Sequence, residues 1–179
     1  QVAAQDRTHN LAFAGIWDLP FGKNRAFLNN MGRIGQAIFG NWRANANLIY
    51  QTGVPLAAWR SWEFLCGNPL AIKRDENNWF NRDRNCYRQL LPFELIQLPA
   101  RFHQIRSHTA PQLDVMLSKR FPFGDRYELE FRGEAFNATN TPLRGDPPST
   151  NPSDPQFGIL PVQQLNFPRN IQLGMRLRF

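Results

Sequence analysis

Five segments of the chain alternate apolar and polar residues with a period of two. The last ten residues, NIQLGMRLRF, show the pattern most clearly, with apolar side chains at Ile171, Leu173, Met175, Leu177 and Phe179. Such alternation predicts a β-strand with one apolar and one polar face, because successive side chains of a strand point to opposite sides. The same reasoning predicts strands near residues 9–21, 41–56, 111–123, 126–137 and 169–179.

The connections between these segments alternate in length. A Gly-Asp pair at 124–125 predicts a tight hairpin, and three apolar residues within 22–40 predict one helical turn in a moderate link. Residues 57–110 and 138–168 are long and rich in Pro, Asn and Arg. Long loops without regular structure are unusual inside a compact soluble domain. Short turns at one end and long loops at the other are typical of an outer-membrane β-barrel.

The polar faces of the five segments carry mainly Arg, Glu, Asn and Gln. Opposite charges on neighbouring strands can pair across a wet lumen, each pair contributing roughly 0.2–1 kcal/mol. Taken alone, this feature fits a lumen and a solvent-exposed sheet equally well. The aromatic residues favour the barrel, because girdles at the water interfaces are expected there. Those near the short-turn ends are Trp17, Phe21, Trp42, Phe121, Phe123, Tyr127 and Phe179.

Composition limits the classes of protein to which this chain can belong. The chain of 179 residues is long enough for one domain, and its 13% aromatic content argues against disorder. Its net charge of +7 comes from Arg residues mixed with Asp and Glu, and this mixture argues against a nucleic-acid-binding surface. The sequence contains no run of eighteen apolar residues and no retained secretion signal, so a transmembrane helix is excluded.

The two cysteines, Cys66 and Cys86, lie in the same long connection. They have no His or Cys neighbours at ligand spacing, so they make a poor zinc site. A disulfide between them would indicate an oxidising compartment and would stabilise the fold by roughly 3 kcal/mol. Two unpaired thiols remain the alternative, because pairing cannot be read from a sequence.

Several stretches follow one another in an order typical of a known family. The most specific are FRGEAFNATNTP and the terminal NIQLGMRLRF, preceded by GNWRANANLIYQTGVPL. Together they resemble the C-terminal end of TonB-dependent outer-membrane receptors, especially the Oar-like group with a carboxypeptidase-regulatory-like N-terminal domain. The resemblance covers nearly the whole chain and is weakest between Cys66 and Cys86.

The resemblance implies an all-β fold, an antiparallel transmembrane barrel of the 22-strand type, of which residues 1–179 supply about five strands and the long outer loops. It also implies that the barrel-assembly machinery reads the terminal aromatic Phe179 as its signal. Five strands cannot close a barrel, because two open edges in lipid would leave backbone groups unsatisfied at several kcal/mol each. We therefore expect a segment of a longer receptor, or one chain of a barrel built from several pieces.

Aromatic and Arg side chains are concentrated in residues 57–110. Together they suit stacking on sugar rings, planar chelates or peptides, with charge for anionic groups. An equally good interpretation is a loop that packs around its own aromatic core and is closed by the disulfide. The candidate ligand-binding residues are Trp59, Trp62, Trp79, Arg82, Arg84 and Tyr87.

Catalytic and metal chemistry find little support in the sequence. His103 and His108 have no acidic partner at ligand spacing, which argues against a metal site. The sequence carries no nucleophile elbow, phosphate loop or zinc-protease motif, so we expect neither an enzyme nor a cofactor.

The resulting hypothesis is a bacterial outer-membrane transport receptor for a bulky nutrient such as a siderophore, glycan or peptide. Its expected partners are the rest of the same receptor, the TonB complex, the barrel-assembly machinery and outer-membrane lipid, but not nucleic acid. One alternative is a structural or adhesive surface protein that uses the barrel as an anchor; the RGD at Arg144–Asp146 is too short to decide this. A second alternative is a soluble basic β-domain that binds anionic polymers.

Overall fold

The computed structural model describes residues 2–70, 72–124 and 126–179, so Asp125 of the expected hairpin turn lies outside the described residues. The chain divides into two compact units. The sheet unit comprises residues 11–49, 111–141 and 167–179. The loop unit comprises residues 1–10, 50–110 and 142–166.

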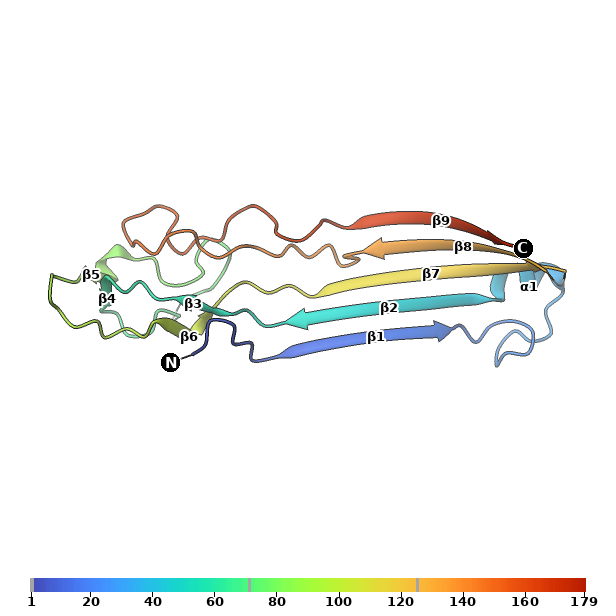
Figure 1. The fold of residues 1–179 in the computed structure, drawn as a ribbon, viewed down its shortest axis with the longest axis horizontal. Helices are drawn as coiled ribbons and strands as arrows, with labels where there is room; N and C mark the ends of the chain where they lie inside the picture. The colour runs from blue at the N-terminus through green and yellow to red at the C-terminus, as the bar shows by residue number, and fades with distance from the viewer. Residues whose placement is uncertain (1, 71, 125) are drawn as a thin grey trace. The chain divides into compact units, whose positions relative to one another are not determined.

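The sheet unit contains a five-stranded sheet in the order β1-β2-β7-β8-β9, in which neighbouring strands run in opposite directions (Figure 1). Each strand lies within one of the five segments expected from the alternation. Among the described residues, the two outer strands pair on one side only. The strands are β1 Asn10–Asp18, β2 Trp42–Gln51, β7 Gln112–Phe123, β8 Tyr127–Phe136 and β9 Asn170–Arg178.

Between β8 and β9, the register keeps apolar side chains opposite apolar ones and places Glu residues opposite Arg or Gln. Between β8 and β9, Phe131 lies opposite Met175, whereas Glu130 lies opposite Arg176. The apolar face carries no packed layer from the described residues, since Leu173 is 88% exposed. An uncovered apolar face of this kind is unfavourable in water, so the sheet needs an apolar environment against this face.

A short helix, α1 (Arg33–Phe39), lies in the link between β1 and β2 and confirms the predicted helical turn. The backbone N–H of Gly40 donates to the carbonyl of Gln36 at 3.0 Å and ends the helix. The indole N–H of Trp42 then donates to the carbonyl of Ile38 at 2.9 Å, which ties the helix to the start of β2. The helix and the C-terminus lie at the same end of the sheet (Figure 1).

One residue of β7 breaks the alternation of apolar and polar positions. Lys119 occupies an apolar-face position between Leu117 and Phe121, and it is only 4% exposed. Its Nζ donates to the carbonyl of Gly40 and lies 5.2 Å from the ring centroid of Trp42. The buried cation is therefore held by a carbonyl oxygen and an aromatic ring, both favourable partners for an ammonium group.

The long connections are more regular than the sequence suggested. In the loop unit, β3 (Pro55–Ala57) pairs with β6 (Arg101–Arg106), and β4 (Trp62–Phe64) pairs with β5 (Tyr87–Gln89). A 3₁₀ turn, η1 (Arg84–Cys86), leads directly into β5. Local antiparallel pairing thus satisfies backbone groups within the first long connection.

The loop unit has its own hydrophobic core. It is built from residues far apart in the sequence, since Phe157 from the second long connection packs with residues of the first. Among the described residues, no helix is long and apolar enough to cross a membrane. The core residues are Leu56, Trp59, Phe80, Cys86, Tyr87, Ile105 and Phe157.

Candidate functional site

Opposite charges gather on the polar face of the sheet unit. The Nε of Arg43 donates to Oδ1 of Asp18 at 2.6 Å. Arg178 donates to Oε1 of Glu128 at 2.8 Å and to Oε2 of Glu130 at 3.3 Å. These pairs join β1 to β2 and β8 to β9, and partial exposure limits each to roughly 0.2–1 kcal/mol. The face is therefore a charged, wettable surface that suits a water-filled lumen.

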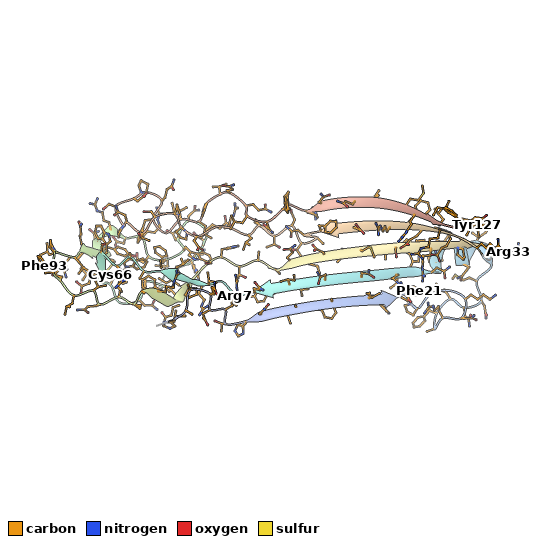
Figure 2. The ribbon with its side chains drawn as sticks, in the orientation of Figure 1. Arg7, Phe21, Arg33, Cys66, Phe93 and Tyr127 are labelled. Atoms are coloured by element: carbon orange, nitrogen blue, oxygen red, sulfur yellow. A yellow bond between two sulfur atoms is a disulfide. The ribbon has the colours of Figure 1, made fainter. Side chains whose placement is uncertain are left out.

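Aromatic residues mark one end of the same sheet. Figure 2 shows Phe21 and Tyr127 at the end where Arg33 begins α1. Both rings are exposed, as expected for side chains that face a membrane–water boundary rather than a protein core. The terminal Phe179, which follows β9, is 94% exposed. These positions are compatible with an aromatic girdle at the short-turn end.

In the loop unit, the candidate binding residue Trp59 is a packing residue. It is 3% exposed, and its ring centroid lies 4.5 Å from that of Phe102, 4.9 Å from that of Phe80 and 5.4 Å from that of Tyr87. Tilted and edge-on arrangements at these distances stabilise aromatic clusters beyond the burial of their area. The structure thus places Trp59 and Tyr87 in the aromatic core that the sequence left as an equal alternative.

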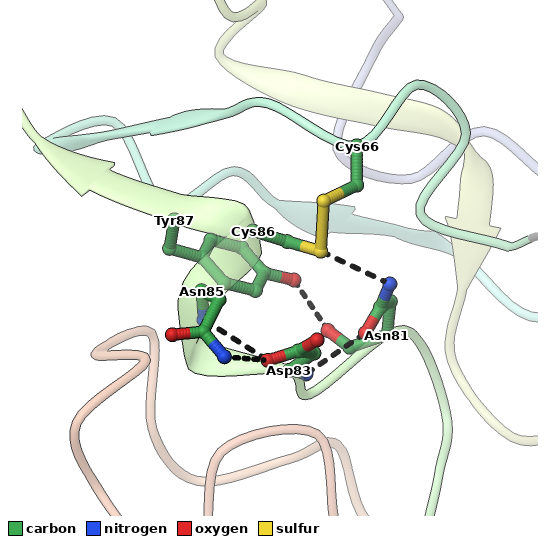
Figure 3. The surroundings of a disulfide bond; sticks show 6 residues. All are labelled: Cys66, Asn81, Asp83, Asn85, Cys86 and Tyr87. Atoms are coloured by element: carbon green, nitrogen blue, oxygen red, sulfur yellow. Dashed lines mark hydrogen bonds between the residues drawn. A yellow bond between two sulfur atoms is a disulfide. The ribbon is translucent and has the colours of Figure 1, made fainter.

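Cys66 and Cys86 form a disulfide, with their Cα atoms 5.2 Å apart, so the alternative of two free thiols was wrong. Figure 3 shows how the surrounding turn is held. Oδ1 of Asp83 accepts from the backbone N–H of Asn85 at 3.0 Å, which caps the 3₁₀ turn. The hydroxyl of Tyr87 donates to the carbonyl of Asn81, and burial raises the pKa of Tyr87. These contacts fix the disulfide at the edge of the aromatic core.

Arg82 joins the two long connections. Its guanidinium donates to three backbone carbonyls: Nε to Phe157 at 2.7 Å, Nη1 to Asn77 at 2.9 Å and Nη2 to Pro155 at 2.9 Å. The chain can pass this close because Gly158 adopts a φ of +69°, and a Cβ there would lie 2.8 Å from Cγ of Arg82. With its donors used in this way, Arg82 has a structural role, since it links the first long connection to the second.

The remaining candidate residues have separate surroundings. The indole N–H of Trp79 donates to the carbonyl of Arg106 at 2.7 Å, and the guanidinium carbon of Arg74 lies 3.6 Å from the Trp79 ring centroid. Trp62 is partly buried against the core, whereas Arg84 is exposed in η1. The six candidate residues therefore do not converge on one binding surface.

The two histidines of the first long connection also have individual roles. Nδ1 of His108 accepts from the backbone N–H of Arg144 at 3.2 Å, and burial lowers the pKa of His108. His103 is exposed on β6. Within residues 2–70, 72–124 and 126–179, no group of three or more His, Cys, Asp or Glu is arranged to hold a metal ion.

Sequence reasoning missed a cavity of about 240 Å³ in the loop unit. Its walls include Leu56, Trp59, Phe80, Phe102 and Ile105. Polar residues line the same cavity, and they come from both long connections: Arg101 from the first, and Asp146, Ser149 and Thr150 from the second. No local pattern could have revealed the cavity, because Arg101 and Asp146 belong to different connections and meet only in the folded unit.

A family model described as an outer membrane beta barrel domain matches residues 1–172 of the chain. The chain therefore belongs to this family, and it resides in the bacterial outer membrane. No curated protein and no solved structure matches the chain. The family assignment removes the alternative of a soluble β-domain and explains the uncovered apolar face of the sheet, because that face can contact lipid.

Proposed function

We propose that this chain is the C-terminal portion of a TonB-dependent receptor that takes up a bulky nutrient across the outer membrane. The observation that carries the proposal is the sheet β1-β2-β7-β8-β9, with a charged face, an exposed apolar face and two outer edges unpaired among the described residues. In lipid, such edges need strands to pair with, because unsatisfied backbone groups cost several kcal/mol each.

In this proposal, the chain contributes about five strands to a barrel of the 22-strand type, as the resemblance implies. The ion-paired face that contains Arg43 and Arg178 lines the lumen, and Leu173 and its neighbours contact lipid. The loop unit lies outside the cell, where a folded and disulfide-closed surface can meet the nutrient first. The chain then acts by binding and transport rather than by catalysis.

The adhesive alternative gains no support from the RGD sequence. The guanidinium of Arg144 forms an ion pair with Glu76 at 3.2 Å and donates to the carbonyl of Val162. Its side chain is 18% exposed, so it is engaged within the loop unit rather than free to meet a partner. A purely structural surface protein has no need of a TonB partner, and that difference separates the two functions.

The proposal is tested with the outer-membrane protein that carries this chain, purified in detergent. We expect the soluble periplasmic domain of TonB to bind it, and imaging of the particle to show β9 paired with a strand outside residues 1–179. Absence of TonB binding, together with a barrel made of copies of this chain alone, would refute the proposal. Binding of TonB by a closed 22-stranded barrel would support it.

A further inference from the structure

The cavity of the loop unit has the features of a ligand site. Its walls are apolar on several sides, with aromatic rings from Trp59, Phe80 and Phe102 and aliphatic groups from Leu56 and Ile105. Cavities of this kind, with a few convergent polar groups, are the usual form of small-molecule sites. The loop unit is also closed by a disulfide, so the walls are held in place before a ligand arrives.

Two opposite charges line this cavity without neutralising each other. Nη1 of Arg101 donates to the carbonyl of Pro55 at 3.0 Å, and no described residue takes its other guanidinium donors. Asp146 is exposed and forms no ion pair or hydrogen bond with any described residue. In the same unit, the carboxylates of Glu63, Glu76 and Glu94 are all ion-paired with arginines. The charges at the cavity are therefore available to a ligand.

The size of the cavity limits the ligand. At about 240 Å³, it lies below the roughly 300–1,000 Å³ of sites for drug-sized molecules. It exceeds the roughly 150 Å³ of an apolar cavity known to hold benzene. One aromatic ring with a few further atoms therefore fits. A sugar ring of similar size fits less well, because it carries hydroxyl groups on all sides, and those that face Leu56 and Ile105 would lose water without gaining partners there.

We propose that this cavity binds a free α-amino acid with an aromatic side chain. The ring enters the apolar cavity, the α-carboxylate pairs with Arg101, and the α-ammonium group pairs with Asp146. This inference goes beyond the proposed function, because a free amino acid is a small ligand of the loop unit and not the bulky nutrient that the receptor takes up. Opposite charges in the lining of a largely apolar cavity match a zwitterion with an apolar tail more closely than they match a neutral ligand.

The test is calorimetric titration of the detergent-purified outer-membrane protein with L-phenylalanine. We expect saturable binding, and we expect Arg101→Gln and Asp146→Asn each to weaken it roughly ten- to hundredfold, the effect of losing one charge-assisted hydrogen bond. Arg60→Gln is the matched control, because Arg60 is exposed and does not line the cavity. This control should bind like the parent protein. Near-ultraviolet circular dichroism of each variant reports whether the aromatic core remains folded.

Ligand analogues separate the contributions of the ring and of the charges. Glycine, which lacks the ring, and N-acetyl-phenylalanine amide, which lacks both charges, should bind at least tenfold more weakly than L-phenylalanine. Preferential binding of glucose would overturn the proposal, and so would L-phenylalanine binding that neither variant changes. Absence of any phenylalanine binding would also overturn it.

The titration and the TonB-binding assay together distinguish this inference from the proposed function. Phenylalanine binding by a protein that does not bind TonB and forms a barrel from copies of this chain alone leaves the site and refutes the receptor. TonB binding without phenylalanine binding leaves the receptor and refutes the site.

Discussion

Replacement of Leu173 by arginine tests the assignment of faces in the sheet. Leu173 lies in β9 (Asn170–Arg178), three residues after its first residue, which is roughly 10 Å along the strand at about 3.4 Å per residue. Its side chain is 88% exposed on the apolar face, so the proposed orientation sets it in lipid well inside the apolar band of about 25 Å. We expect Leu173→Arg to destabilise the folded protein by roughly 2–4 kcal/mol.

The neighbouring residue provides a matched control. Gln172 lies on the opposite face and pairs in register with Glu134, so Gln172→Arg places the same charge next to a carboxylate in the lumen. We expect this control to change the free energy of unfolding by less than about 1 kcal/mol. The assay is reversible urea unfolding of the protein in phospholipid vesicles, followed by tryptophan fluorescence. Greater destabilisation by Gln172→Arg would mean that the faces have been assigned the wrong way round, and equal effects of the two variants would mean that neither face lies in lipid.

Three further predictions concern the terminus, the disulfide and a histidine. Phe179→Asp should reduce assembly into the outer membrane, measured as the heat-modifiable folded band in membrane fractions, whereas Phe93→Asp at an equally exposed loop position should not. Normal assembly of the first variant would count against Phe179 as the assembly signal. Cys66→Ser should cost the loop unit roughly 2–5 kcal/mol, seen as faster proteolysis and hydrogen exchange within 57–110, while the sheet keeps its protection. For His108, the pKa is lowered from 6.5 by burial, so the unfolded state binds more protons and loop-unit stability should fall as pH drops through about 6.5. His108→Asn, which keeps an acceptor near the Arg144 N–H but does not titrate, should flatten that pH dependence in hydrogen exchange; an unchanged slope would assign it to another group.

The alternation of side chains was enough to predict the strands because it is a local property. In β9, the alternation of apolar and polar residues already indicates the face on which each side chain lies. The pairing with β8 then places apolar residues opposite apolar ones. The helical turn at α1 follows for the same reason. The burial of Lys119 on the apolar face could not be predicted in this way. It depends on a hydrogen bond to the carbonyl of Gly40, and sequence periodicity does not reveal that contact.

The candidate site could not be predicted in the same way because its contacts are not local. Arg82 looked like a ligand-binding cation, yet its partners Phe157 and Pro155 belong to the other long connection. Trp59 looked like a stacking platform, yet five other rings pack around it. Composition predicted an aromatic and arginine-rich segment correctly, but only the tertiary fold decides which side chains are used in packing and which, like Asp146, remain available.

The disulfide between Cys66 and Cys86 has a consequence for the order of events in biogenesis. Periplasmic oxidation can close this bridge as soon as the two cysteines meet, before the strands on either side enter the outer membrane. From then on, residues 66–86 form a closed ring. In the proposed orientation, this ring crosses the outer membrane as a cross-linked unit whose two sides cannot move past each other. A chain kept reduced until after insertion would meet no such restriction, so the timing of oxidation decides whether the connection between β2 and β7 crosses as two independent chains or as one linked unit.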